Sequence, residues 1–205
     1  MLFRSSAVAA PKVAAKDPRL EEWERLSGTT DVGGLEAFRR RASDQYSQLA
    51  EKRIEELEWN AAQGSRDPQR LRAFRERHPR SAHAIRAASE ADRIERESAG
   101  RAVQDALSRY KAAFEGRDIA AVRAIWPALG GSQAQAIENG FKNSKSIRMT
   151  LAMVGEPQIQ GNSATVTCSR KQVIQTRSGP PLTPEHTVTF RLRKAGDGWV
   201  IDSIQ

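Results

Sequence analysis

Two hydrophobic periods divide the sequence. Before Lys145, apolar residues recur at the three- and four-residue intervals of a helix, as Val103, Leu107, Tyr110 and Phe114 do. Beyond Lys145 they alternate with polar or small residues, which is typical of strands with one buried face. The change predicts an α+β order, with helices before an antiparallel sheet.

The second half of the chain is expected to hold three helices and then four strands. Asp118 can cap the second helix, Pro127 ends it, and Gly130-Gly131-Ser132 opens the third. Turn sequences at residues 155–157, 161–162, 179–181 and 196–198 separate the strands. The alternating apolar residues of the strands are Ile147, Met149, Leu151 and Met153; Ala164, Val166 and Cys168; Val188, Phe190 and Leu192; and Trp199 and Ile201.

Residues 21–98 contain a repeat. An offset of 36 aligns Glu22-Trp23 with Glu58-Trp59, and the further matches are Gly28/Gly64, Asp31/Asp67, Leu35/Leu71, Ala37/Ala73, Phe38/Phe74, Arg39/Arg75 and Arg41/Arg77. This period is typical of stacked helical hairpins. The alignment predicts that Trp23 and Trp59 are equivalent structural residues, and that Ile85, Ala88 and Ile94 share the buried face of the last repeat helix.

We expect residues 1–20 to form a disordered leader, 21–98 the repeats, and 102–205 a separate domain, with a hinge at residues 98–100. No signal peptide or membrane-spanning segment is recognised, and the compartment is left open. The formal net charge of +8 favours anionic partners. Cys168 is the only cysteine and no Cys/His set has zinc spacing, so we expect a buried thiol, no metal and no cofactor.

The repeats resemble the Trp-marked, tetratricopeptide-like units in accessory regions of multidomain bacterial proteins, including those with kinase or caspase-like domains. The resemblance covers residues 21–97 and rests on the pairs Trp23/Trp59, Asp31/Asp67 and Phe38/Phe74. The first unit departs from it, with Ala42-Ser43 where the second has His78-Pro79. The resemblance implies a module that docks other proteins.

Residues 102–205 resemble NTF2-like (SnoaL-like, ketosteroid-isomerase-like) cone domains. The matching positions are Tyr110, Phe114, Asp118, Ile119, Val122 and the closing run 198–201. This resemblance implies three helices packed on a curved antiparallel sheet, a cup for a small apolar ligand, and homodimers formed through the sheet.

In the isomerases of that superfamily a tyrosine at the place of Tyr110 donates to an oxyanion. Their acidic base has no counterpart here, because residues 127–131 and 186–190 contain no Asp or Glu, and proton abstraction needs an acceptor. We therefore interpret Tyr110 as a core residue with its hydroxyl at the cup mouth. His186 shares the parity of Val188 and is either a polar anchor in the cup or a solvent-exposed residue at a strand end.

The candidate cup-lining residues are Tyr110, Phe114, Trp126, Phe141, His186 and Phe190. The candidate partner contacts, from the arginine-rich stretch 66–80, are Arg70, Arg72, Arg75 and Arg77. Nucleic acid is disfavoured, because no aromatic stacking platform accompanies these arginines. His78 and His83 do not share a helical face and are interpreted as surface residues.

The sequence thus predicts a non-enzymatic interaction or ligand-binding module that docks a protein partner. Two alternatives stay open. One is a small SnoaL- or isomerase-type enzyme that uses Tyr110 and His186, and the other is an electrostatic binder of nucleic acid or membrane through the arginines.

Overall fold

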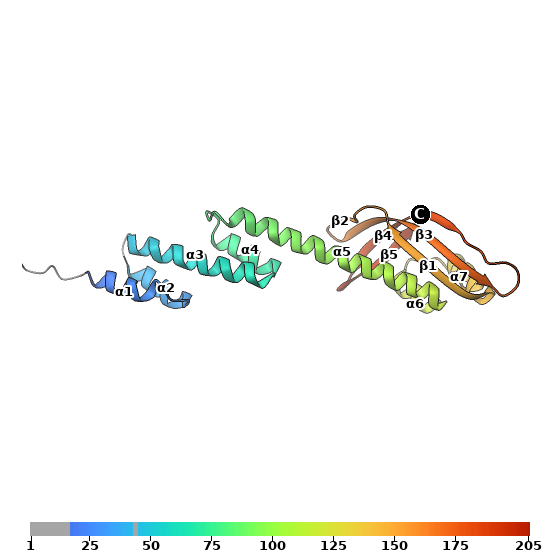
Figure 1. The fold of residues 1–205 in the computed structure, drawn as a ribbon, viewed down its shortest axis with the longest axis horizontal. Coiled ribbons are helices and arrows are strands. Elements are labelled where there is room, and N and C mark those ends of the chain that lie inside the picture. Colours follow the sequence, from blue (N-terminus) through green and yellow to red (C-terminus); the bar gives the residue numbers. More distant parts are fainter. Residues whose placement is uncertain (1–16, 43–44) are drawn as a thin grey trace, which may run out of the picture. The chain divides into compact units, whose positions relative to one another are not determined.

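The computed structural model describes residues 17–42 and 45–205, and these form two compact units (Figure 1). The first unit ends at Asp92 and the second begins at Arg93, both within the helix α5 (Ala84–Gly116). Residues 1–16 of the expected leader lie outside the described residues. Residues 18–20 are helical rather than disordered, because the Asp17 carboxylate accepts from the Arg19 amide at 3.0 Å and Pro18 occupies the first turn.

The first unit consists of helices: α1 (Pro18–Leu26), α2 (Val32–Arg41), α3 (Gln45–Ser65), α4 (Pro68–Arg77) and the first residues of α5. The expected capping chemistry is present at α4, where the Asp67 carboxylate accepts from the Gln69 amide at 2.9 Å. The second helix of the first repeat continues without a break into the first helix of the second repeat, as α3.

Contacts as well as residues recur at the offset of 36. The paired contacts are Trp23–Phe38 and Trp59–Phe74, with ring centroids 6.2 and 5.4 Å apart; Glu22–Arg41 and Glu58–Arg77, with ion pairs of 2.8 and 2.7 Å; and Thr29–Asp31 and Ser65–Asp67, in which the hydroxyl accepts from the amide at 3.1 Å. Leu35 and Leu71 are both fully buried. The sequence repeat is therefore a repeat of packing.

Two predictions about this packing are wrong. Trp59 is buried, at 5% exposure, whereas Trp23 is only half-buried, because α1 covers one end of the unit and contributes no fully buried residue. In the part of α5 that belongs to the first unit, the buried residues are Ala84, Ala87 and Ala91, and Ile85 is 81% exposed. The packed face of this part carries alanines, which allow close helix approach, so the prediction from the larger aliphatic residues named the wrong face.

The second unit contains the rest of α5, α6 (Ile119–Ile125) and α7 (Gly131–Asn143), followed by the sheet. The Asp118 carboxylate caps α6 by accepting from the Ala121 amide at 3.0 Å, as expected. Residues 98–100, the expected hinge, lie inside the helix α5. Gly100 lowers helix propensity without ending the helix.

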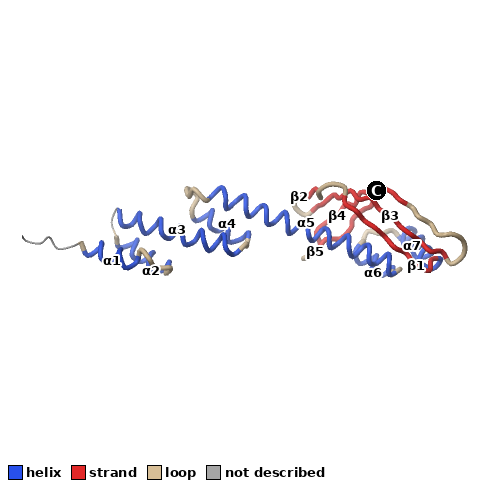
Figure 2. Tube along the Cα trace, viewed as in Figure 1, coloured by secondary structure: helices blue, strands red, loops and turns tan. Residues whose placement is uncertain are grey.

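The sheet is antiparallel and contains β1 (Ser144–Met153), β2 (Gln158–Gln160), β3 (Ser163–Thr176), β4 (Glu185–Ala195) and β5 (Gly198–Ile204). Its order is β1-β3-β4-β5, and the short β2, which was not predicted, pairs with β3 beyond the end of β1. The helices cover one face of the sheet (Figure 2). This is the α+β architecture expected of a cone, with three helices packed on a curved sheet.

The core of the second unit lies between this sheet face and the helices, and it takes alternate residues from each strand, such as Val166, Phe190 and Ile201. Side chains of α5 also bond both edges of the sheet. Glu115 accepts from the Met149 amide of β1 at 2.8 Å, and Arg109 donates to the Trp199 carbonyl of β5 at 3.1 Å. These bonds satisfy edge groups that would otherwise be free to pair with another strand.

Candidate binding sites

A row of aromatic rings runs through the second unit. Tyr110 contacts Phe190 edge-on at 5.3 Å between ring centroids and Phe114 at 4.7 Å, and Phe114 meets Phe141 edge-on at 5.4 Å. Four of the six predicted cup-lining residues are therefore contiguous. Tyr110 and Phe190 are buried at 1% and 0% exposure, so they form the floor of the core rather than a free surface.

A cavity of about 250 Å³ opens where this row ends, and its walls come from α5, α7, β1, β3 and the segment after β3. It is lined by Phe114, Ile137, Gly140, Phe141, Asn143, Ser144, Ile147, Gln172, Ile174, Thr176 and Leu182. Most of these groups are apolar. No acid, base, thiol or phenol is among the lining residues, so the cavity walls supply no group that titrates.

Tyr110 lies deeper than predicted. Its hydroxyl, expected at the cup mouth, is enclosed and receives a long hydrogen bond of 3.5 Å from Nη1 of Arg170. Burial raises the pKa of the phenol, and the positive charge of Arg170 opposes this shift without cancelling it. The phenol therefore stays protonated at neutral pH.

Arg170 was missed by the sequence reasoning. It continues the inward parity of Val166 and Cys168 on β3, and its Nε is buried with no hydrogen-bond partner among the described residues. The strand alternation could have predicted this position, because Arg170 follows Ala164, Val166 and Cys168 at the two-residue spacing of the buried face.

Trp126 and His186 do not border the cavity. Trp126 directly follows α6 and is buried, and its indole Nε1 has no hydrogen-bond partner in the described part of the chain. His186 is exposed at the start of β4, directly across from Arg170 in the register. The solvent-exposed alternative for His186 is thus the one seen.

The four candidate arginines of the second repeat differ in their partners. Arg77 bridges Glu36 and Glu58, Arg72 pairs with Asp92 at 3.3 Å and Arg70 pairs with Asp67 at 3.8 Å. Only Arg75 among the four has no partner among the described residues.

Arg75 borders a hollow of about 420 Å³, whose other lining residues are Pro79, Ala84, Ile85, Ala88, Ser89 and Asp92. The buried Ala50 and Ile54 of α3 match Ala87 and Ala91 of α5 at an offset of 37, one more than in the preceding part of the repeat, and this match aligns Ile85 with Gln48, which is exposed in the first repeat. The second repeat therefore presents an exposed isoleucine where the first presents an amide.

The two repeat histidines are half-buried structural residues, contrary to the surface interpretation. Nε2 of His78 lies 2.6 Å from a carboxylate oxygen of Glu58, and the His83 ring stacks on Trp59 at 4.7 Å. Cys168 is fully buried, as expected, and burial raises the pKa of its thiol.

Comparisons with known proteins found similarity only among solved structures, since no family model and no curated protein matches the chain. A candidate dehydratase of the NTF2-like family from Streptomyces avermitilis is 19% identical, with a TM-score of 0.46, over 53% of this chain and 94% of that one. An NTF2-like superfamily protein from Salmonella enterica serovar Typhimurium is 14% identical, with a TM-score of 0.44, over 53% and 89%. A candidate aromatic ring hydroxylase from Novosphingobium aromaticivorans is 18% identical, with a TM-score of 0.46, over 52% and 85%.

Within the described residues, no helix combines the length and apolar character that a membrane span needs. The second unit has an α+β fold of helices and an antiparallel sheet, and it contains an apolar cavity whose lining residues include no titrating group. The first unit presents a separate hollow beside an unpaired arginine.

Proposed function

We propose that the second unit is a non-enzymatic binding domain that holds a small apolar ligand in the cavity between Phe114, Phe141 and Ile174. The observation that carries this proposal is the wall of the cavity, which is mainly apolar and contains no titrating side chain. Its volume of about 250 Å³ corresponds to roughly eight water-sized groups, at about 30 Å³ each. This suits a compact ring system rather than a polymer.

Gln172 is the polar group that would orient such a ligand. The Ser144 hydroxyl already donates to the Phe141 carbonyl at 3.1 Å, and the Thr176 hydroxyl donates to the Gly179 carbonyl at 3.0 Å. The side-chain amides of Gln172 and Asn143 have no partner among the described residues, and each can both donate and accept; Gln172 is half-buried whereas Asn143 is exposed. A ligand with one carbonyl or hydroxyl group on an apolar ring fits this arrangement.

Catalysis of the isomerase kind would need a proton acceptor within hydrogen-bond reach of the ligand. Tyr110 and Arg170 do not border the cavity, and His186 is exposed at the start of β4. These positions favour binding over turnover. The Tyr110–Arg170 donor pair could stabilise an anion but could not itself remove a proton, and His186, which lies across from Arg170 in the register, is exposed.

The test uses the full chain and a panel of ring compounds, namely indole, 2-naphthol and camphor, titrated while backbone amides are followed by NMR. Binding should perturb the residues around Gln172, and Gly140→Leu should abolish it. An added Cβ at Gly140 meets nothing within 4 Å, so the larger side chain can enter the cavity without disturbing α7.

Gly131→Leu is the matched control, because it lies on the same helix and also has open space, but does not border the cavity. The proposal would be contradicted if none of the compounds perturbed the amides of the cavity residues. Equal loss of binding in both variants would contradict it too.

We also propose that the first unit docks a protein partner, as the tetratricopeptide-like resemblance implies, at the hollow between Arg75 and Ile85. The exposed isoleucine and the unpaired arginine support this second function. Ile85→Gln introduces the residue found at the matching position of the first repeat and should remove docking with little change in stability. Leu49→Gln changes an exposed residue of the first repeat that does not border the hollow, and it should leave docking intact. Quantitative mass spectrometry of proteins retained by the full chain compares the two variants.

Two further proposals rest on resemblance alone. One is that the repeats are joined to a larger signalling protein, and the other is that the chain forms a homodimer through the sheet. Light scattering of the full chain measures the dimer directly, and a monomer mass across the accessible concentration range would contradict it.

A further inference from the structure

The helical hairpin of the first repeat, formed by α2 and α3, is covered by the start of the second repeat. Arg77 of α4 pairs with Glu36 of α2, and the Ser81 hydroxyl, in the segment after α4, donates to the Glu55 carboxylate of α3 at 2.6 Å. The end of α4 also borders a hollow of about 190 Å³ between these helices, which is lined by Glu36, Arg39, Glu51, Ile54, Arg77 and His78. A segment of the following repeat therefore closes the hollow of the preceding one.

The hollow of the second repeat, of about 420 Å³, lies between the matching helices α4 and α5. Two of its lining residues, Arg75 and Ala88, correspond to Arg39 at an offset of 36 and to Glu51 at an offset of 37. From α5 the chain continues into the second unit and not into a third hairpin. The described residues of the first unit therefore provide no following repeat to cover this hollow.

The surface of the second hollow differs from that of the first in charge. In the first repeat Arg39 pairs with Glu51 at 3.9 Å. In the second repeat Ala88 replaces the carboxylate, and Arg75 has no partner among the described residues. Because Ile85 of the same hollow is 81% exposed, an unpaired guanidinium lies beside an exposed apolar surface.

The other charges at this hollow are paired within the second repeat. Arg72 and Asp92 occupy the positions of Glu36 and Glu55, and they pair with each other at 3.3 Å. In the first repeat, by contrast, both glutamates bind the covering segment. Asp92 is the only carboxylate that lines the second hollow, so the unpaired charge that an occupant would meet is Arg75.

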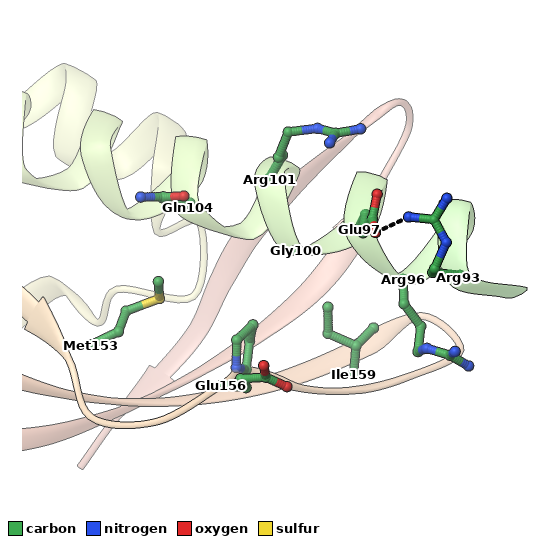
Figure 3. Close-up of a pocket in the computed structure, with 10 residues that line it drawn as sticks. Arg93, Arg96, Glu97, Gly100, Arg101, Gln104, Met153, Glu156 and Ile159 are labelled. Atoms are coloured by element: carbon green, nitrogen blue, oxygen red, sulfur yellow. Dashed lines mark hydrogen bonds and ion pairs between the residues drawn. The ribbon is translucent and has the colours of Figure 1, made fainter. Parts of the chain in front are cut away.

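This single unpaired charge distinguishes the hollow from the other open surfaces of the chain. A groove of about 590 Å³ on the second unit, beside residues 93–104 of α5, is lined by Glu97 and Glu156 as well as by arginines, so its charges select no occupant (Figure 3). Residues 1–16 of the chain contain three basic residues and no acidic one, so they do not complement Arg75. A carboxylate from another protein does, through bonds to the planar guanidinium.

We propose that the hollow of the second repeat binds an acidic amphipathic helix of a partner protein, in the place that a third repeat would take. This inference rests on the docking function proposed above for the first unit. Apolar side chains of the helix would contact Ile85 and Ala88, and a carboxylate would pair with Arg75. The α5 wall from residue 84 to 92 is about 12 Å long at 1.5 Å per residue, which matches about two turns of a helix at 5.4 Å each.

The experiment measures the fluorescence anisotropy of labelled peptides of about 18 residues, long enough to form a helix, mixed with the full chain. The acidic probe is an alanine-based helix with leucine at every third or fourth position and glutamate beside each leucine. One control probe carries lysine in place of glutamate, and the other carries two central prolines, which break the helix. We expect only the acidic helix to bind, and amide NMR should place it at Ile85 and Ala88.

Variants of the hollow test each contact. Ala88→Glu restores the carboxylate of the first repeat beside Arg75 and should abolish binding, whereas Ala88→Gln, of the same size but uncharged, should weaken it less. Arg75→Gln should weaken binding about fivefold, as expected for the loss of one exposed ion pair, and Ile85→Gln at least about tenfold. Arg40→Gln is the matched control, since Arg40 is an exposed arginine of α2 outside the hollow with no partner among the described residues.

Several results would overturn the proposal. Equal binding of the lysine and glutamate helices, or binding of neither, is one, and equal weakening by Arg40→Gln and Arg75→Gln is another, because it would make the attraction one of net charge only. Equal binding of the proline control would make the occupant an extended segment. Self-association of the unaltered chain that Ile85→Gln abolishes, measured by light scattering, would make it a second copy of the chain.

The same variants separate this proposal from the docking function on which it rests. If Ile85→Gln removes proteins retained by the full chain in the mass-spectrometric comparison, but the acidic helix does not bind, the helix proposal is overturned and the docking function stands. If Ile85→Gln changes neither the retained proteins nor the binding of the helix, both are overturned.

Discussion

Replacing each repeat tryptophan by alanine tests the packing of the first unit, because the two residues are equivalent in sequence and unequal in structure. Trp59 is 5% exposed, contacts Phe74 at 5.4 Å, stacks on His83 at 4.7 Å and lies under the Arg86 guanidinium at 5.6 Å. Truncating such a buried aromatic costs about 3–5 kcal/mol. Trp23 is half-buried and stacks on Phe38 with ring centroids 6.2 Å apart, so Trp23→Ala should cost about 1 kcal/mol.

Urea unfolding of the full chain, followed by far-ultraviolet circular dichroism, measures the difference. With a slope of about 1–3 kcal/mol per M, Trp59→Ala should lower the midpoint of the first unit by at least about 1 M, or remove that transition altogether. Trp23→Ala should shift it by about 1 M or less. Equal shifts in the two variants would refute the argument from burial, and so would an unchanged midpoint in Trp59→Ala.

Three further predictions concern the second unit. Burial raises the pKa of Tyr110 above 10.0, so the stability conferred by the neutral phenol is present below pH 10.0 and is lost as the pH rises through the raised pKa. In Tyr46→Phe, which leaves Tyr110 as the only tyrosine, the phenolate absorbance should titrate above pH 10.0. A midpoint at or below pH 10.0 would contradict the burial. The Cys168 thiol, fully buried and with a raised pKa, should react with Ellman's reagent only after denaturant is added, and fast reaction of the native chain would place it at the surface. A fragment of residues 93–205 should melt cooperatively without the repeats, since its apolar core is drawn from its own helices and strands, and a melt without a transition would show that the repeats are needed.

The elements of the second unit were predictable from sequence because local rules agree there. Asp118 caps α6, Pro127 follows its end, and the alternation in β3 and β4 marks the buried face. The repeats were equally visible, through pairs such as Trp59 and Phe74. Where one local rule stood alone, it failed: Gly100 suggested a hinge, but a single glycine does not end a 33-residue helix whose flanking residues favour it.

The candidate site was predicted only in part, since side-chain burial depends on contacts between distant segments. Phe114 and Phe141 border the cavity, but Gln172 and Ile174 complete it from a strand that follows α7, and no local pattern indicates that meeting. Ile85 was assigned to the core by hydrophobicity, yet the neighbouring alanines are the ones that pack.

We propose that the second unit binds a small apolar ligand without converting it. The most direct test incubates the full chain with steroid-like and polyketide-like ketones and follows product formation and α-proton exchange by NMR, beside Tyr110→Phe and His186→Ala. We expect that compounds which perturb the cavity residues are recovered unchanged, and that their α-protons exchange at the same rate with each of the three proteins as without protein. Turnover by the unaltered chain that both variants abolish would contradict it.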